Sequence, residues 1–240
     1  MTAISHEDLA VSREDQMTIV AARVLRDGMR CFVGIGLPSV ATNLARRTHA
    51  RRVVLIYESG TIGAKPSRLP LSIGDGELAE TADAVVSVPE IFNYWLQPGR
   101  INVAFLAGAQ IDRQGNINTT VIGSYDEPTV RLPGAGGAPE IASGCGRVIV
   151  VMRQSKRTFV DRLDFLTSVG RPERVITDIG VLQPDTKSGE LILTALHPGA
   201  QLEEAVRATG WPLKIAESVA VTEIPSTEEL TALQALREGK

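Results

Sequence analysis

Residues 31–60 read CFVGIGLPSVATNLARRTHARRVVLIYESG, and this stretch decides the fold. It begins with an apolar run at residues 31–33, which is typical of a short buried strand. Pro38 then suits the first position of a helix over residues 39–47. A continuous apolar and β-branched run follows at residues 53–57, as expected for a strand that is covered on both faces. A strand, a helix and a second strand in this order predict a parallel sheet with right-handed crossovers.

The same alternation continues outward on both sides of this stretch. On the N-terminal side, Ser12 and the acidic residues after it predict a helix start, and the apolar spacing runs to Leu25 before Gly28. On the C-terminal side the pattern predicts strands at 84–88, 101–106, 147–152, 175–176, 181–182 and 191–195, and helices at 89–96, 201–208 and 227–238, with a short one from residue 138.

One hairpin and one gap complete the prediction of the fold. Gly115-Asn116 indicates a hairpin or tight loop between residues 110–112 and 117–122, whereas residues 71–81 fit no element. We find no internal repeat and no long linker. The predicted fold class is therefore α/β, as a single domain over residues 1–240 with a mostly parallel sheet flanked by helices.

The composition excludes several classes of function. Of the 240 residues, 43% are hydrophobic, 22% are charged and 4% are aromatic, which is usual for a globular chain and not for a disordered one. The net charge of -3 gives no basic footprint for nucleic acid. No run approaches the roughly 18 apolar residues of a membrane helix, and the first residues, with His6, Glu7 and Asp8, lack the order of a signal peptide. We expect a cytoplasmic protein with neither a nucleic-acid nor a membrane partner.

The cysteines and histidines do not predict a metal or disulfide site. Cys31 and Cys145 are far apart, and the three histidines are scattered singly, so zinc spacing is absent and a disulfide framework is implausible. Small buried side chains are favoured for both cysteines over a catalytic thiol. A Gly-x-Ser-x-Gly elbow is also absent, although a Ser-His-Asp triad could still assemble from distant positions. Carboxylates, hydroxyls and backbone groups are therefore the expected source of chemistry.

Four segments should lie together at one edge of the sheet, because ligands of open α/β sheets bind beyond the carboxyl ends of the strands. These segments are residues 34–38, 58–60, 108–110 and 134–137. Three of them are rich in glycine, which lets backbone N–H groups approach a ligand closely. The fourth carries Glu58 directly after the most hydrophobic strand.

Glu58 is the most informative residue of this edge. A carboxylate at the end of a buried strand is costly unless neighbouring groups compensate it. Glu58 therefore either caps the next turn or pairs with a surface arginine, or it acts as a nucleophile or general base. The serine and glycines after it, at residues 59–63, favour a tightly turned loop around the carboxylate.

The glycine-rich segments allow more than one interpretation. Gly34-x-Gly36-x-x-Ser39 is a weak match to a dinucleotide fingerprint because the third glycine is missing. Residues 134–137, before a helix start, are either an oxyanion or phosphate cradle or a plain loop. Asn116 and Asn118 are either turn residues or donors to a carbonyl oxygen.

Several short motifs in one order resemble the β subunit of family I CoA-transferases, and most closely that of glutaconate CoA-transferase. They cover nearly the whole chain from about residue 17. The matching segments are Val33-Gly34-Ile35-Gly36-Leu37-Pro38, Glu58-Ser59-Gly60, Gly108-Ala109-Gln110-Ile111-Asp112, Gly115-Asn116-Ile117-Asn118, Ile122-Gly123-Ser124-Tyr125, Gly134-x-Gly136-Gly137 and Arg207-Ala208-Thr209-Gly210.

This resemblance implies an α/β fold, an α subunit of related fold as partner, and transfer of CoA from an acyl-CoA to a small free carboxylic acid. Coenzyme A then enters as the acyl-CoA substrate, and no permanently bound cofactor is implied. The catalytic glutamate of the family falls on Glu58. The remaining implied site residues are Gly134, Gly136 and Gly137 with Asn116 and Asn118 at the thioester oxygen, and Gly34, Gly36, Ser59, Gly60, Gly108, Ala109 and Gln110 in the CoA and substrate loops.

The resemblance also sets the alternatives. Some members are hydrolases or decarboxylases that have replaced the glutamate, so retention of Glu58 favours transfer and leaves acyl-CoA hydrolysis or a non-catalytic subunit as alternatives. The substrate is expected to be a dicarboxylic or 3-oxo acid. The candidates to bind a second substrate carboxylate are Lys65, Arg68, Arg153 or a group of the partner subunit.

Overall fold

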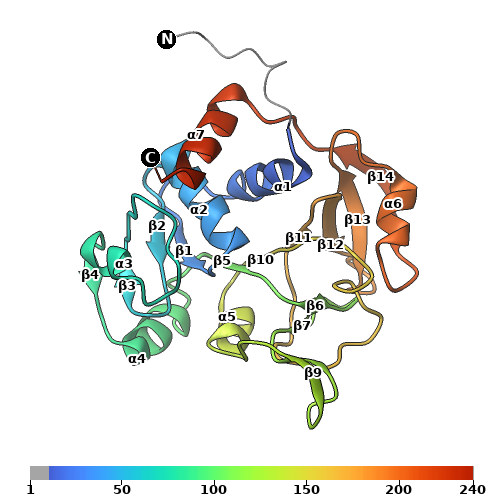
Figure 1. Ribbon diagram of the computed structural model, residues 1–240, viewed down its shortest axis with the longest axis horizontal. Helices are drawn as coiled ribbons and strands as arrows, with labels where there is room; N and C mark the ends of the chain where they lie inside the picture. Colours follow the sequence, from blue (N-terminus) through green and yellow to red (C-terminus); the bar gives the residue numbers. More distant parts are fainter. Residues whose placement is uncertain (1–10, 240) are drawn as a thin grey trace.

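A ten-stranded sheet runs through the molecule in the order β14-β13-β12-β11-β10-β5-β1-β2-β3-β4 (Figure 1). The structure is a computed structural model and describes residues 11–239. The first residues, on which the expectation about a signal peptide rests, lie outside the described residues. The strands of this sheet are β1 (Arg30–Val33), β2 (Val54–Ile56), β3 (Thr61–Ile62), β4 (Ala84–Val85), β5 (Val103–Leu106), β10 (Val148–Val151), β11 (Arg174–Ile176), β12 (Gly180–Pro184), β13 (Leu191–Leu196) and β14 (Lys214–Val221).

The centre of the sheet is parallel and its flanks are mixed. Strands β2, β1, β5, β10 and β11 are parallel neighbours, whereas β3 and β4 on one side and β12 and β13 on the other are joined by antiparallel pairing. This confirms the predicted mostly parallel α/β sheet. The carboxyl ends of β1, β2 and β5 consequently meet at one edge.

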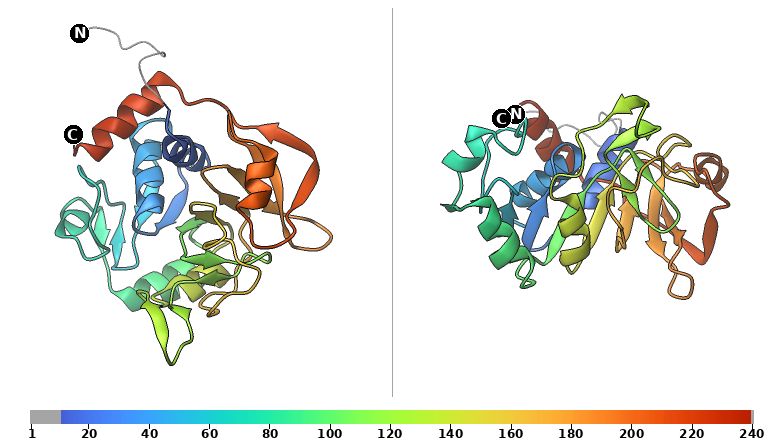
Figure 2. Two further views of the ribbon diagram at one scale, coloured as in Figure 1. Left: turned by 45° about the vertical axis from the view of Figure 1, so that its right-hand side comes forward. Right: turned by 90° about the horizontal axis from the view of Figure 1, so that it is seen from below.

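Helices cover both faces of the sheet (Figure 2). On one face α1 (Arg13–Ala22), α2 (Leu37–Arg47) and α7 (Thr227–Arg237) lie together over a core that includes Met17, Leu44 and Leu230. On the other face α5 (Ala138–Gly144) and α6 (Leu202–Arg207) pack over a second core. Because side chains alternate along β1, Cys31 and Val33 join the first core and Phe32 joins the second.

Most predicted elements are confirmed, with boundaries that differ from the predicted ones by a few residues. The helix start at Ser12 forms a capping box, since the Asp15 amide donates to Ser12 Oγ at 3.1 Å and the Ser12 amide donates to Asp15 Oδ2 at 3.2 Å. This helix ends at Ala22, ahead of the predicted Leu25. The predicted strand 84–88 is only the two-residue edge strand β4. The predicted helix 89–96 is a short α4 (Val88–Glu90) that continues as a π-helix, η1 (Ile91–Leu96).

Two small sheets lie beside the main one. The predicted hairpin is present as β6 (Gln110–Ile111) and β7 (Ile117–Asn118), but β8 (Val121–Gly123) leaves it and pairs with β9 (Pro128–Arg131). Residues 71–81, which fitted no element, form a loop and the short α3 (Gly76–Glu80). No helix within residues 11–239 is long and apolar enough to cross a membrane.

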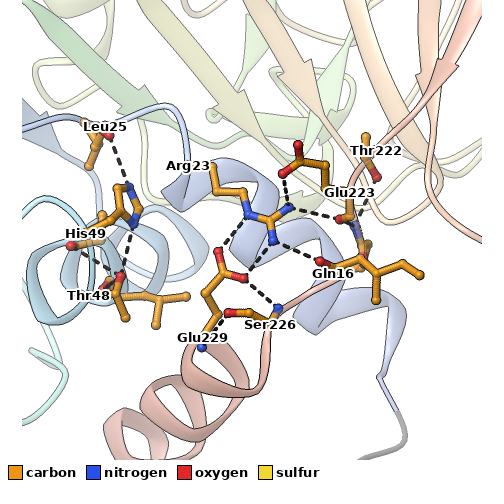
Figure 3. Close-up of polar contacts among 12 residues, drawn as sticks. Gln16, Arg23, Leu25, Thr48, His49, Thr222, Glu223, Ser226 and Glu229 are labelled. Atoms are coloured by element: carbon orange, nitrogen blue, oxygen red, sulfur yellow. Dashed lines mark hydrogen bonds and ion pairs between the residues drawn. The ribbon is translucent and has the colours of Figure 1, made fainter. Parts of the chain in front are cut away.

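Arg23 joins the first helix to the C-terminal one (Figure 3). Its guanidinium donates to both carboxylate oxygens of Glu229, each at 2.7 Å, and to the Glu223 carbonyl at 3.0 Å. The Glu229 side chain is only 13% exposed and also accepts from the Ser226 amide at 2.8 Å. The paired guanidinium therefore compensates a carboxylate that is largely withdrawn from water.

Arg23→Gln is expected to lower the free energy of unfolding by about 1–3 kcal/mol, because it leaves the Glu229 carboxylate partly buried and poorly paired. Chemical denaturation measures this loss. The matched control is Arg26→Gln, an exposed arginine of the adjoining turn, for which we expect a change within about 0.5 kcal/mol. Equal losses for the two variants would contradict the role given to the Arg23–Glu229 pair.

Candidate active site

Glu58 follows β2 in a tight turn and points toward the start of α5. The turn is closed by the Gly60 amide, which donates to the Tyr57 carbonyl at 3.0 Å, and Tyr57 itself is fully buried. The Gly137 amide donates to Glu58 Oε2 at 3.1 Å. A carboxylate and a backbone amide that are 79 residues apart in the sequence are thus in direct contact.

Glycine is required where the backbone passes this carboxylate. A Cβ at residue 137 would lie 2.5 Å from Glu58 Oε2 and 2.4 Å from Cζ of Phe92. Gly136 has a φ of +50° and a Cβ there would lie 3.5 Å from Glu58 Oε1. The glycine turn therefore brings the main chain against the carboxylate as no other residue type could.

A cavity of about 720 Å³ opens in front of Glu58. It is lined by the segments after β1, after β5 and before α5, and by the loop around Ile73; the lining residues that were predicted for the site are Gly34, Glu58, Gly108, Ala109, Gly134, Gly136 and Gly137. The structure therefore brings together parts of all four segments that were expected at this edge of the sheet.

Asn116 and Asn118 lie outside this cavity, and their side chains are used within the protein. Nδ2 of Asn116 donates to Asp112 Oδ2 at 2.8 Å, and its Oδ1 accepts from the Gly170 amide at 3.1 Å. Nδ2 of Asn118 donates to the Val121 carbonyl at 2.7 Å and to Gln110 Oε1 at 2.8 Å. In this structure both side chains thus stabilise the β6–β7 hairpin and its surroundings.

Four further predicted residues support the site without lining the main cavity. Gly36, with a φ of +82°, precedes the first residue of α2. A Cβ at Gly60 would lie 1.9 Å from the Val86 carbonyl oxygen, so the glycine lets the 60–62 segment approach β4. The Gln110 side chain is buried and donates to Asp164 Oδ2 at 2.9 Å. Ser59 lines a second cavity, of about 540 Å³, which Glu58 also lines.

The three cations considered for a second substrate carboxylate are all engaged elsewhere. Lys65 forms an ion pair with Asp83, Arg68 with Asp75, and Arg153 with Glu14. None of the three lines either cavity beside Glu58.

Neither cysteine lines a cavity beside Glu58. Burial raises the pKa of both Cys31 and Cys145, which agrees with buried, unreactive thiols. Burial lowers the pKa of His197, whose Nε2 lies 2.7 Å from the Thr177 carbonyl oxygen in the core.

Sequence patterns missed two groups that shape the site. Phe92, near the start of η1, packs against Gly137 beside the carboxylate. Thr119 fixes the glycine turn from the other side, because its Oγ1 donates to the Gly134 carbonyl at 2.8 Å and its carbonyl accepts from the Gly134 amide at 2.9 Å. No local signal in the sequence marks either residue.

Asp75 holds the loop that closes one wall of the cavity. Its carboxylate accepts two hydrogen bonds from the Arg68 guanidinium, at 2.8 and 2.9 Å, and one from the Leu71 amide at 3.0 Å. The Arg68 guanidinium, together with the backbone amides, lowers the pKa of Asp75 from its ordinary value of 3.8 to about 2.

Asp75→Asn is expected to destabilise the protein at neutral pH but not in strong acid. A carboxyl group whose pKa is lower in the folded state stabilises the fold above pH 3.8, and that stabilisation is lost as the pH falls through about 2. Thermal unfolding of both proteins across this range should show midpoints that differ at pH 7 and converge near pH 2. A difference that does not depend on pH would argue against the ionised carboxylate as its cause.

Comparison with known proteins shows which family this chain resembles in sequence and in fold. Residues 15–208 match the family model described as Coenzyme A transferase. The chain is 56% identical to the B chain of 3-oxoadipate CoA-transferase from Pseudomonas knackmussii, over 95% of this chain and 94% of that protein. Among solved structures, glutaconate CoA-transferase of Acidaminococcus fermentans superposes with a TM-score of 0.86 at 28% identity, covering 94% of each chain. The decarboxylase AibA/AibB superposes with a TM-score of 0.85 at 25% identity, covering 95% of this chain and 96% of that one.

Proposed function

The chain belongs to the coenzyme A transferase family and is the β subunit of a CoA-transferase, and from this we propose that Glu58 is the residue on which CoA is carried. The donor is an acyl-CoA and the acceptor is a free carboxylic acid. The names of its relatives, 3-oxoadipate and glutaconate CoA-transferase, favour an acid of the 3-oxo or dicarboxylic class. The observation that carries the proposal is the Glu58 carboxylate held by the Gly137 amide at the wall of the cavity.

The reaction proceeds by two exchanges at one carboxylate. An oxygen of Glu58 attacks the thioester carbonyl, which forms a mixed anhydride and expels CoA thiolate. The thiolate attacks the glutamyl carbonyl of the anhydride, which releases the first acid and leaves a glutamyl-CoA thioester. The acceptor carboxylate then repeats both steps in the reverse direction. Each bond that breaks is replaced by an activated acyl bond, so the chemistry needs no ATP.

The Gly137 amide is placed to assist each exchange. Every attack on the glutamyl carbonyl turns its oxygen into an oxyanion, and a preplaced donor on that oxygen lowers the barrier; losing one such donor costs about 3–4 kcal/mol in other enzymes. The amide already donates to Glu58 Oε2 before reaction. We assign this donor role to Gly137 and give Asn116 and Asn118 a structural role.

An α subunit is expected to cover the cavity. The mixed anhydride must be shielded from water, because hydrolysis would destroy the acyl bond. Leu71, at the mouth of the cavity, is 86% exposed in the isolated chain, so a covering subunit would remove an apolar side chain from water beside the reactive group. We propose that this side chain is buried by the α subunit. We also propose that the assembled enzyme works in the cytoplasm, because that compartment keeps cysteines such as the two free ones of this chain reduced.

Oxygen isotopes test the route through Glu58. If the acceptor acid is labelled with ¹⁸O in its carboxylate, one label should pass to the Glu58 carboxylate and from there to the acid released from the donor. Mass spectrometry of the Glu58 peptide and of the released acid measures this. Transfer of CoA with no label in the peptide would exclude a glutamyl intermediate.

Glu58→Asp is expected to convert part of the transfer into hydrolysis. The shorter side chain withdraws the carboxylate from the Gly137 amide and leaves room for water beside the acyl group. The ratio of free acid to new acyl-CoA, measured with the assembled enzyme, should rise at least about tenfold. An unchanged ratio would contradict the argument that the full length of the Glu58 side chain helps to keep water from the acyl group.

A further inference from the structure

The β8–β9 hairpin, residues 121–131, extends away from the main sheet as an arm. Figure 1 and the left view of Figure 2 show it reaching outward, and among the described residues its two strands pair only with each other. A hairpin of two strands is marginally stable by itself and depends on packing against other groups. The stability of the arm therefore depends on what covers its two sides.

One side of the arm packs against this chain. Val121 and Arg131 are opposite each other in the two strands, so their side chains share this side, and Val121 is fully buried. The Arg131 guanidinium lies 5.0 Å from the centre of the Tyr125 ring, and that ring stacks on Phe165 with the centres 5.3 Å apart. These contacts hold the arm in place on the rest of the chain.

The other side of the arm is apolar and largely uncovered. Ile122 and Val130 are opposite each other and share this side, where Ile122 is half-buried and Val130 is 47% exposed. Because side chains alternate along an extended chain, Leu132 follows on the same side, and its amide continues the pairing by donating to the Thr120 carbonyl at 3.0 Å. Leu132 lines the cavity in front of Glu58, so this side of the arm leads into that cavity.

A subunit that closes the cavity has to contact this side of the arm. In the proposed function, on which this inference rests, the α subunit covers Leu71 and keeps water from the mixed anhydride. Leu71 and Leu132 line the same cavity, so closing its mouth brings the partner against Leu132 and, two residues further out, against Val130. Apolar side chains that continue from a cavity wall to the surface are typical of a protein–protein contact.

We propose that the α subunit docks on the apolar side of the β8–β9 arm, which is formed by Ile122, Val130 and Leu132. The arm is then held between the rest of this chain on one side and the partner on the other. Burial of this apolar side supplies the packing that an isolated hairpin lacks. Since Leu132 lies two residues before the glycine turn at 134–137, the same contact also fixes the segment that leads to the turn.

The experiment measures the dissociation constant of the assembled α–β enzyme by ultracentrifugation across a dilution series. Val130→Glu places an unpaired charge in the proposed contact and should raise the Kd at least about 100-fold. Val130→Thr, which has nearly the same shape, should raise it about 5- to 30-fold because its hydroxyl is buried without a partner. The matched control is Val221→Glu, at the end of the edge strand β14, where the valine is 70% exposed. It should leave the Kd within about twofold.

Transfer activity provides a second readout of docking. In Val130→Glu the enzyme concentration at which half of the specific activity is lost on dilution should rise by the same factor as the Kd. The kcat well above the Kd should stay within about threefold of the wild type, because Val130 lines neither cavity beside Glu58. This separates a loss of docking from a loss of catalysis.

An unchanged Kd in Val130→Glu and Val130→Thr would overturn the proposal, as would an equal rise in Val221→Glu. A complex of two copies of this chain that Val130→Glu disrupts, with α binding unaffected, would assign this side to a second copy and also contradict the proposal. Glu58→Gln tests the proposed function separately, because it should abolish transfer and leave the Kd unchanged. Full transfer by that variant would refute the role of Glu58 without altering the result for the arm.

Discussion

Glu58→Gln is expected to lower kcat for CoA transfer by about 10⁴- to 10⁶-fold, the loss typical of removing a covalent nucleophile. The amide keeps the size of the side chain and an oxygen that can accept from Gly137, but it has no anionic oxygen to attack the thioester. The fold should be unaffected, because the amide oxygen preserves the hydrogen bond that the Glu58 side chain accepts from the Gly137 amide. Initial rates with saturating acyl-CoA and acid measure the loss.

The matched control is Glu80→Gln, an exposed glutamate at the end of α3 that lines neither cavity. It should retain transfer within about twofold of the wild type. Full activity of Glu58→Gln would mean that the partner subunit supplies the catalytic residues and that this subunit only shapes the site. Loss of transfer with undiminished release of free acid would instead identify a hydrolase that does not need the carboxylate.

Gly137→Ala is expected to lower kcat by about 100-fold or more while the protein stays folded. Its methyl group would have to occupy space 2.5 Å from Glu58 Oε2 and 2.4 Å from Phe92 Cζ. Either the carboxylate or the ring must move by about 1 Å, and a displacement of that size at a reacting group costs about 10²-fold. The overpacking should also lower the free energy of unfolding by about 1–3 kcal/mol.

Gly76→Ala is the control for this substitution, because a Cβ at residue 76 meets no atom of the described residues within 4 Å. It should leave both kcat and the unfolding midpoint close to the wild-type values. If Gly137→Ala retained full activity, the contact between the glycine turn and Glu58 would not contribute to catalysis. Parallel measurements of kcat and of denaturant unfolding separate the two effects.

The sequence predicts the central part of the fold because its signals there are local. The β1–α2–β2 unit carries an apolar strand, a proline at the helix start and a second apolar strand, and each is formed as predicted. The carboxyl-edge rule and the resemblance together placed Glu58 and the 134–137 turn in one site, although 79 residues separate Glu58 from Gly137.

Other features depend on long-range contacts that a single sequence does not reveal. Strand β14 reads KIAESVAV and lies exposed at the sheet edge, so its pattern lacks a clear apolar face. A π-helix of six residues has the same local composition as an α-helix. What distinguishes η1 is the spacing of its backbone hydrogen bonds, in which an amide donates to the carbonyl five residues earlier in the chain.

The roles of Asn116 and Asn118 also depend on partners elsewhere in the chain. Motif matching puts both amides near the site, but their hydrogen bonds go to Gly170, Val121 and Gln110 within the hairpin and its surroundings. A sequence pattern shows that an amide is present, and it cannot show which groups already use it.

The most direct measurement is the mass of the Glu58 peptide after the assembled enzyme has been incubated with acyl-CoA alone and then quenched with borohydride. Reduction of a glutamyl thioester converts the carboxyl group to a primary alcohol, so the account predicts a peptide about 14 Da lighter, at Glu58 and at no other glutamate. An unaltered Glu58 peptide from enzyme that is active in transfer would contradict it.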